Sequence, residues 1–74
     1  MEGIRIKLVE LKVLLESQNN TISRFIEKLI KQLDGNDDSF IDEILNASKI
    51  QDFMHYKSAY LFCEILEMVD KLKN

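Results

Sequence analysis

The chain has 74 residues and a formal net charge of −3, a length that predicts one domain over 1–74 and a charge that disfavours nucleic acid as the main ligand. Its single cysteine excludes an internal disulfide, and one cysteine with one histidine is too few for a structural zinc site, so no metal or cofactor is expected. No apolar run is long enough to cross a membrane or to serve as a secretory signal, which predicts a cytoplasmic protein.

The first predicted helix, over 3–17, has apolar residues on two opposite sides. One stripe recurs at helical spacing and is suited to face a core; it consists of Ile4, Leu8, Leu11 and Leu15. The second stripe, on the far side, consists of Ile6, Val9 and Val13. Because a helix in a small bundle usually needs one apolar stripe, the second is expected to be covered either by another helix of the chain or by another protein, and self-association is one form of the latter.

The second predicted helix covers 21–33 and has a single apolar side, which is typical of a helix that packs on a core. That side consists of Ile22, Phe25, Ile26, Leu29, Ile30 and Leu33. Asn19 or Asn20 is expected to cap its start, because a side-chain oxygen there accepts a hydrogen bond from a first-turn backbone N–H. A turn over 34–37 follows, with Gly35 expected to end the helix.

Two further helices are expected, over 38–46 and 49–71. Ser48 and Gln51 have the spacing of a capping box, which favours a break between the two helices over one continuous rod. The four segments predict an all-α fold. Their short connections predict a compact bundle of three or four helices in which neighbours are mostly antiparallel.

An aromatic cluster lies on the side of the last predicted helix that is opposite its apolar core side. It consists of Phe53, Tyr56 and Tyr60, with Lys49, Lys57, Glu64 and Glu67 around it. Aromatic side chains ringed by polar groups are enriched at protein interfaces, so the cluster is a candidate anchor for a protein partner. The alternative is that another helix of the chain crosses this side and buries the three rings.

The stretch 34–46 is acidic and contains no lysine or arginine. Its five carboxylates belong to Asp34, Asp37, Asp38, Asp42 and Glu43. The last four of them are expected to steer a basic partner, since complementary charge speeds association and selects the partner. The alternative is that they stabilise the start of the next helix, where Asp38 or Ser39 is the expected cap. A calcium loop is not predicted, because Leu45 occupies the position of the bidentate glutamate.

The sequence shows no pattern that indicates catalysis. His55 and Cys63 are eight positions apart, about 12 Å along a helix, which is too far for a nucleophile and its base. The adjacent Asp42 and Glu43 point apart on a helix and do not form an acid–base pair. A basic stripe on the second predicted helix leaves DNA binding as an alternative; it consists of Arg24, Lys28 and Lys31.

Several segments and their order along the chain match a family pattern. They are LKVLLE over 11–16, QNN over 18–20, FIEKL over 25–29, IL over 44–45, SKIQDF over 48–53 and KSAY over 57–60. In this order the chain resembles small helical bacterial proteins of the toxin-immunity type. That family has a glycine-rich turn before a Ser-Leu-Asn-Asp-like stretch, where this chain has Asn46, Ala47 and Ser48. The resemblance implies a cytoplasmic protein that binds and blocks a cognate toxin.

The sequence therefore predicts a protein-binding module without catalytic activity, with an inhibitor of a basic toxic enzyme such as a nuclease as its leading form. The alternative is a self-associating helical regulatory protein, a small DNA-binding or antirepressor-type factor. In that alternative the stripe of Ile6, Val9 and Val13 forms a two-fold interface. A protein partner is expected in the first case and a homodimer in the second, and neither nucleic acid nor a membrane is the expected main partner.

Overall fold

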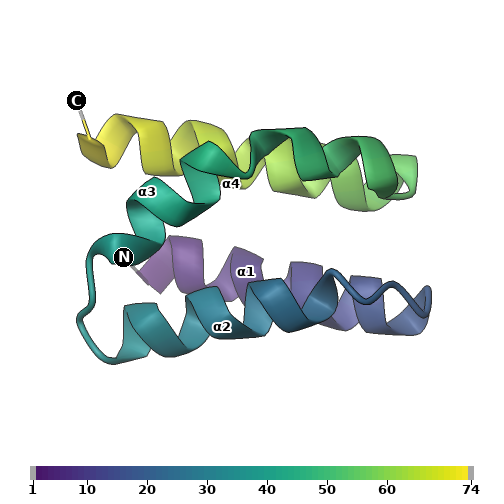
Figure 1. Ribbon diagram of the computed structural model, residues 1–74, viewed down its shortest axis with the longest axis horizontal. Coiled ribbons are helices and arrows are strands. Elements are labelled where there is room, and N and C mark those ends of the chain that lie inside the picture. Colours follow the sequence, from purple (N-terminus) through teal and green to yellow (C-terminus); the bar gives the residue numbers. More distant parts are fainter. Residues whose placement is uncertain (1, 74) are drawn as a thin grey trace.

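The computed structural model describes residues 2–73, and every regular element within that range is a helix. The elements are α1 (Glu2–Ser17), α2 (Ser23–Asp34), α3 (Ser39–Asn46), the 3₁₀ helix η1 (Ser48–Phe53) and α4 (Tyr56–Lys73). α1 and α2 run side by side in opposite directions, α3 and η1 lead back along the molecule, and α4 returns across it (Figure 1). The predicted all-α class is confirmed.

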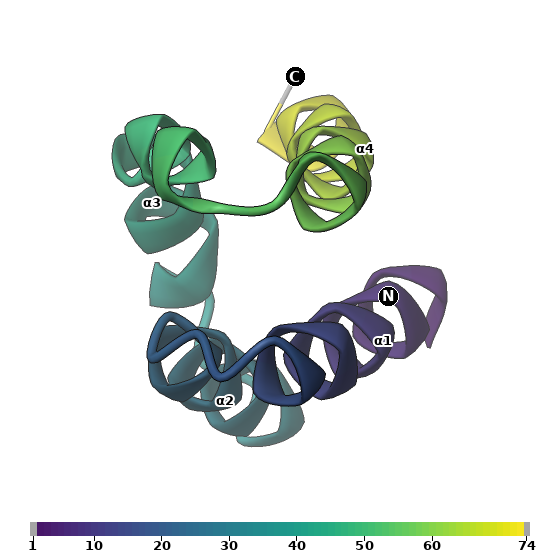
Figure 2. The ribbon, with the colours of Figure 1, turned by 90° about the vertical axis from the view of Figure 1, so that its right-hand side faces the viewer.

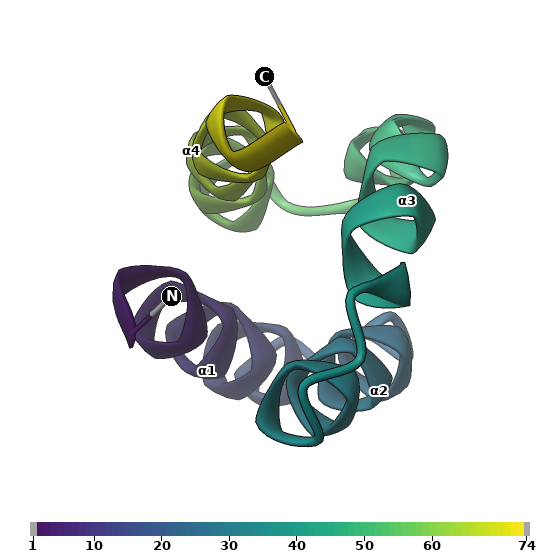
Figure 3. The same ribbon diagram turned by 90° about the vertical axis from the view of Figure 1, so that its left-hand side faces the viewer.

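The helices surround one core. Seen end on in Figure 2, α4 lies above α1, while α3 and η1 lie above α2. α1 packs on α2 and α4, and α3 packs on the same two helices. The Cα radius of gyration is 11.1 Å, which is the value of about 11 Å expected for a compact globule of this length. Figure 3 shows that α1 begins and α4 ends at the same end of the molecule.

The core contains the residues that helical periodicity predicts for α1 and much of the predicted apolar side of α2. The predicted inner stripe of α1 is buried along its whole length, which confirms that prediction. The other helices contribute the remaining buried apolar side chains: Ile26, Leu29, Ile30, Phe40, Ile44, Phe62, Ile65 and Val69. Because the buried residues of each helix recur at three- and four-residue spacing, the four α-helices each direct one side toward the same centre.

The prediction of one helix over 49–71 is wrong in its first third. Residues 48–53 form the 3₁₀ helix η1, Met54 is extended with φ −111° and ψ 150°, and α4 begins at Tyr56. The predicted capping box does not form, because the Gln51 side chain is used elsewhere: its Oε1 accepts a hydrogen bond from the Cys63 thiol, 2.6 Å away. The break expected at 46–48 is present, because α3 ends at Asn46, but a second break that was not predicted follows η1 at Met54.

Two hydrogen bonds to the α1–α2 turn hold the chain at this break. The Asn20 side-chain amide donates to the Phe53 carbonyl oxygen over 3.1 Å, and the Ser58 hydroxyl donates to Gln18 Oε1 over 2.7 Å. Ser58 is the only fully buried polar side chain among the described residues. Because a buried hydroxyl without a partner costs about 1–3 kcal/mol, the bond to Gln18 fixes where α4 can start relative to the end of α1.

Gly35 is the C-cap of α2, as expected, but the left-handed residue that follows each of the first two helices is an asparagine. Asn19 and Asn36 have positive φ values of 55° and 58°, whereas Gly35 has φ −87°. After Asn36 the Asp37 backbone N–H donates to the Gln32 carbonyl, and the Asn36 N–H donates to Leu33. These two bonds form a Schellman motif. The expected cap of α2 by Asn19 or Asn20 does not form: Ile22 is the N-cap and has no side-chain cap, whereas Asn20 Oδ1 accepts from the Ile22 N–H at 2.9 Å in the turn before the helix.

The backbone conformations of Gly35 and Asn36 give a stability prediction. Gly35→Ala should stabilise the fold by about 0.4–1 kcal/mol, because alanine adopts this φ without strain and loses less chain entropy on folding. An added Cβ would lie 3.4 Å from the Lys31 carbonyl oxygen, an ordinary contact. Asn36→Ala should destabilise by about 1 kcal/mol, because alanine is strained at positive φ. Urea unfolding measures both changes, and a loss of stability in Gly35→Ala would contradict the assignment.

Candidate protein-binding surface

Three aromatic rings lie exposed where η1 meets α4. Phe53 ends η1, Tyr56 begins α4 and Tyr60 follows one turn later; their exposed fractions are 77%, 71% and 78%. We call Phe53, Tyr56 and Tyr60 the aromatic surface. The alternative in which another helix of the chain buries the three rings is therefore wrong. The His55 ring lies against Tyr56, with 4.4 Å between the ring centroids.

The core contacts of α4 explain why these rings face outward. Ser58 and Phe62, one turn apart, are buried on the inner side of the helix, so Tyr56 and Tyr60 fall on its outer side. Phe53 reaches the same region by a different route, because it belongs to η1 and its carbonyl is tied to Asn20. The aromatic surface is thus built by two elements and a turn, not by one continuous helix.

The second apolar stripe of α1 is also largely uncovered. Ile6 and Val13 are 50% and 58% exposed, whereas Val9 is partly buried and packs against the core. A shallow apolar depression of about 490 Å³ runs along this side, where Val13 and Leu14 of α1 meet Leu61 of α4. No other helix of the described residues therefore covers Ile6 and Val13.

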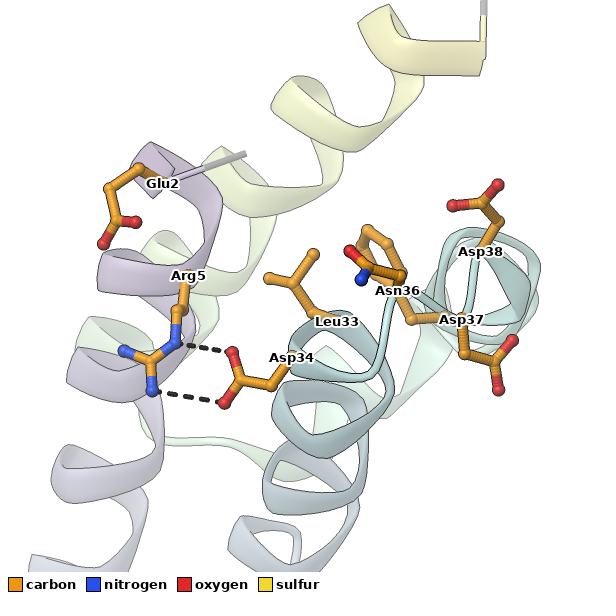
Figure 4. Close-up of a pocket in the computed structure, with 8 residues that line it drawn as sticks. Glu2, Arg5, Leu33, Asp34, Asn36, Asp37 and Asp38 are labelled. Atoms are coloured by element: carbon orange, nitrogen blue, oxygen red, sulfur yellow. Dashed lines mark hydrogen bonds and ion pairs between the residues drawn. The ribbon is translucent and has the colours of Figure 1, made fainter.

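The acidic segment lies at the opposite end of the molecule from the aromatic surface, beside a hollow of about 250 Å³ between α1, α2 and the start of α3 (Figures 1 and 4). Asp34 accepts two hydrogen bonds from the Arg5 guanidinium, at 2.7 and 3.2 Å. These bonds lower the pKa of the Asp34 carboxyl and raise the pKa of Arg5. The pair joins the start of α1 to the end of α2.

Asp37 is a capping residue. Its Oδ1 accepts from the Ser39 backbone N–H at 3.0 Å and from the Ser39 hydroxyl at 2.7 Å, and these bonds lower the pKa of Asp37. Asp38, one of the two expected caps, does occupy the N-cap position of α3, but its side chain makes no cap hydrogen bond. The side chain of Asp38 makes no hydrogen bond or ion pair with the residues of 2–73. Figure 4 shows the two carboxylates pointing in different directions, away from Asp34.

The remaining two acidic residues form ion pairs across the molecule. Asp42 lies 3.1 Å from Nζ of Lys73 near the end of α4, and Glu43 lies 2.9 Å from Nζ of Lys28 on α2. The hydrogen bond from Lys28 is the main cause that lowers the pKa of the Glu43 carboxyl, and Gln32 contributes less. Hydrogen bonds or ion pairs within the chain therefore engage every carboxylate of the acidic segment except that of Asp38. This favours the structural interpretation of the segment over a freely exposed docking surface.

The lowered pKa values predict acid sensitivity. Asp34, Asp37 and Glu43 titrate below their ordinary values of 3.8, 3.8 and 4.5 in the folded chain, so they stabilise the fold above those values. That stability is lost as the pH falls through the folded pKa values. The thermal midpoint should be nearly constant from about pH 5 to 8 and fall below about pH 4. Asp34→Asn should reduce the fall, and a midpoint unchanged between pH 5 and 2 would contradict the assignment.

The basic stripe of α2 is partly neutralised by the chain itself. Lys28 pairs with Glu43, and Lys31 lies 4.0 Å from Glu27 one turn earlier. Only Arg24 of this stripe makes no ion pair within 2–73. Because nucleic acid is bound chiefly through cations that contact phosphates, this arrangement favours a structural use of the stripe.

A hollow of about 280 Å³ adjoins the aromatic surface on the outer side of α4. It is lined by Tyr60, Cys63, Glu64 and Glu67. Glu64 forms an ion pair with Lys7 of α1, with 3.1 Å between Oε2 and Nζ. The Cys63 thiol is occupied by Gln51, and His55 Nδ1 accepts from the Lys57 backbone N–H at 3.3 Å. The sequence pattern placed Glu64 and Glu67 beside the aromatic cluster but did not indicate that they line a hollow.

The comparisons with known proteins identified no relative of this chain. Protein-family models, curated proteins and solved structures were all compared with the chain, and none of them gives a significant match. Within the described residues, no helix is long and apolar enough to span a membrane.

Proposed function

We propose that this chain is a protein-binding module without catalytic activity, and specifically an inhibitor of the toxin-immunity type that binds a cognate toxin in the cytoplasm. The aromatic surface is the observation that carries this proposal. Three large rings on a folded domain of this size form an exposed patch of the kind that marks protein interaction sites. Tyrosine and phenylalanine are also among the residues that contribute most at such sites.

The proposed mechanism is stoichiometric occlusion. Tyr56 and Tyr60 are attached to a helix whose other side is fixed in the core by Phe62, so the rings are presented on a rigid base. A rigid anchor loses little conformational entropy on binding. The acidic segment, with Asp37, Asp38, Asp42 and Glu43, and the net charge of −3 would attract a basic toxin from a distance. Because Lys73 and Lys28 offset the charges of Asp42 and Glu43, the local negative field comes chiefly from Asp37 and Asp38.

Co-expression with a neighbouring gene tests the proposal. The protein encoded beside this chain is produced in bacterial cells with and without it, and cell survival is scored. We expect a toxic product whose effect is abolished by the wild-type chain and a one-to-one complex on size-exclusion chromatography. A non-toxic neighbour that forms no complex, or a toxic one that the chain neither binds nor neutralises, would overturn the proposal.

Self-association through the second stripe of α1 is the second candidate function. The exposure of Ile6 and Val13 beside the apolar depression favours it. On this alternative the isolated chain is a dimer that Val13→Asp converts to a monomer. Val13 is the better site for the test than Val9, because Val9 also packs against the core.

We expect the isolated chain to sediment as a monomer. α1 is about 24 Å long and exposes only two large apolar side chains on this side, Ile6 and Val13. A strip of this size falls short of the roughly 1,000 Å² that a specific interface buries. Sedimentation equilibrium measures the mass, with Val13→Asp as the matched variant. A wild-type dimer that Val13→Asp dissociates would replace the first proposal by the second.

A further inference from the structure

We propose that the hollow beside Tyr60 accepts an arginine side chain of the protein partner. This inference rests on the proposed function and names the chemistry of the partner at one point of the surface. Tyr60, Glu64 and Glu67 lie at i, i+4 and i+7 on α4, so they share one side of the helix. Cys63 completes the lining of the hollow, which has room for one long side chain at about 280 Å³.

The hollow combines an exposed ring with carboxylate charge. Glu67 is exposed, and its carboxylate makes no hydrogen bond or ion pair with any residue of 2–73. Glu64 is shared with Lys7, but its side chain remains 44% exposed. Lys71, one turn beyond Glu67, forms no ion pair with it in the described chain. At least one full negative charge is therefore available beside the Tyr60 ring.

Arginine fits this combination better than the other cationic side chain. Its planar guanidinium can stack on an aromatic ring while its N–H groups point in fixed directions to a carboxylate. A lysine ammonium is a compact, strongly hydrated charge and gains less from the ring. Nucleic acid is disfavoured at this point, because Glu64 and Glu67 would repel its phosphates.

The Cys63 thiol does not set the chemistry of the hollow. It already donates to Gln51 Oε1 at 2.6 Å, which links α4 to η1 behind the lining. The charge presented to a ligand therefore comes from the two glutamates. Tyr60 belongs both to the hollow and to the aromatic surface, so a partner segment would place apolar residues on Phe53 and Tyr56 and its arginine beyond Tyr60.

An NMR titration with a short peptide tests this inference without the partner. Acetyl-tetra-arginine amide is added to the ¹⁵N-labelled chain, and backbone amide shifts are followed. We expect the shifts to be largest between residues 60 and 67 and small between 34 and 43. Tetra-lysine of the same length should bind more weakly, by about two- to fivefold, because it lacks the guanidinium stacking.

Variants of the lining separate stacking from charge. Tyr60→Leu should weaken tetra-arginine binding about two- to fivefold, whereas Tyr60→Phe should retain it, because phenylalanine keeps the ring. Glu67→Gln should weaken it by a similar factor of about two to five. The matched control is Glu16→Gln, which removes the same charge at an exposed site away from the hollow and should change the affinity less.

The outcomes distinguish the inference from the proposed function. Shifts centred on 34–43, or equal affinity in Tyr60→Leu and wild type, would overturn the arginine site. If a cognate toxin binds but Glu67→Gln and Tyr60→Leu bind it as tightly as the wild type, the site is likewise wrong while the proposed function stands. If the peptide binds as expected but the neighbouring gene product is not neutralised, the arginine site stands and the proposed function fails.

Discussion

Phe62→Ala is expected to remove a large part of the stability of this fold. Phe62 is fully buried and is one of the two largest side chains in the core. Replacing a buried phenylalanine by alanine costs about 3–5 kcal/mol, from lost apolar burial and the cavity left behind. A domain of this size has about 4–11 kcal/mol in total. The thermal midpoint measured by circular dichroism should fall by tens of degrees.

The same substitution at Phe53 is the matched control. Phe53 is 77% exposed, so Phe53→Ala should change the free energy of unfolding by about 0.5 kcal/mol or less. Two phenylalanines nine positions apart should thus respond in opposite ways. Equal destabilisation by the two substitutions would show that Phe53 belongs to the core, which would remove one third of the aromatic surface.

Tyr56→Ala combined with Tyr60→Ala should have the largest effect on binding. Aromatic residues at the centre of an interface contribute about 2 kcal/mol or more each, which is roughly a 30-fold loss of affinity per residue. The loss should appear mainly in the dissociation rate, because the rings act after the partners have met. Surface plasmon resonance with the toxin captured on the chip measures both rates.

Leu72→Ala controls for the general loss of exposed apolar surface on α4. Leu72 is 46% exposed near the other end of the helix, so its removal should leave both rate constants within about twofold of the wild type. The thermal midpoint of each variant confirms that the fold is intact. A tight complex formed by a folded Tyr56→Ala/Tyr60→Ala variant would show that the toxin binds elsewhere.

Periodicity predicted the parts of this fold that depend on one helix at a time. The spacing of Leu8, Leu11 and Leu15 is enough to specify which side of α1 is buried, because a regular helix repeats every 3.6 residues. The same pattern identified Ile26 and Leu29 as core residues of α2. Each of these predictions needs only the local repeat, and the structure confirms them.

The end of η1 depends on contacts between segments far apart in the chain, so periodicity could not place it. A regular helix over 49–71 takes no account of the hydrogen bonds to Gln18 and Asn20. These two residues are 40 and 33 positions away in the chain from their partners Ser58 and Phe53. Phe53 illustrates the consequence. Its exposure agrees with the helical pattern, but it arises from a 3₁₀ segment and an extended Met54.

Charge was the least informative part of the sequence for the candidate site. A run of acidic residues looks the same whether its carboxylates are free or occupied, because the partners Arg5, Lys28 and Lys73 are 15 to 31 positions away. The structure assigns most of that run to internal bonds. It also shows that Glu67 lines a hollow together with Tyr60, which the sequence pattern did not indicate.

The placement of the two chain ends has a practical consequence for display and fusion. α1 begins and α4 ends at one end of the bundle, whereas the turn from η1 into α4 lies at the other (Figure 1). A linker, fluorophore or carrier protein attached at either end is therefore directed away from Phe53 and Tyr56. The domain is suited to tethering in one orientation, with its rings pointing toward the solution.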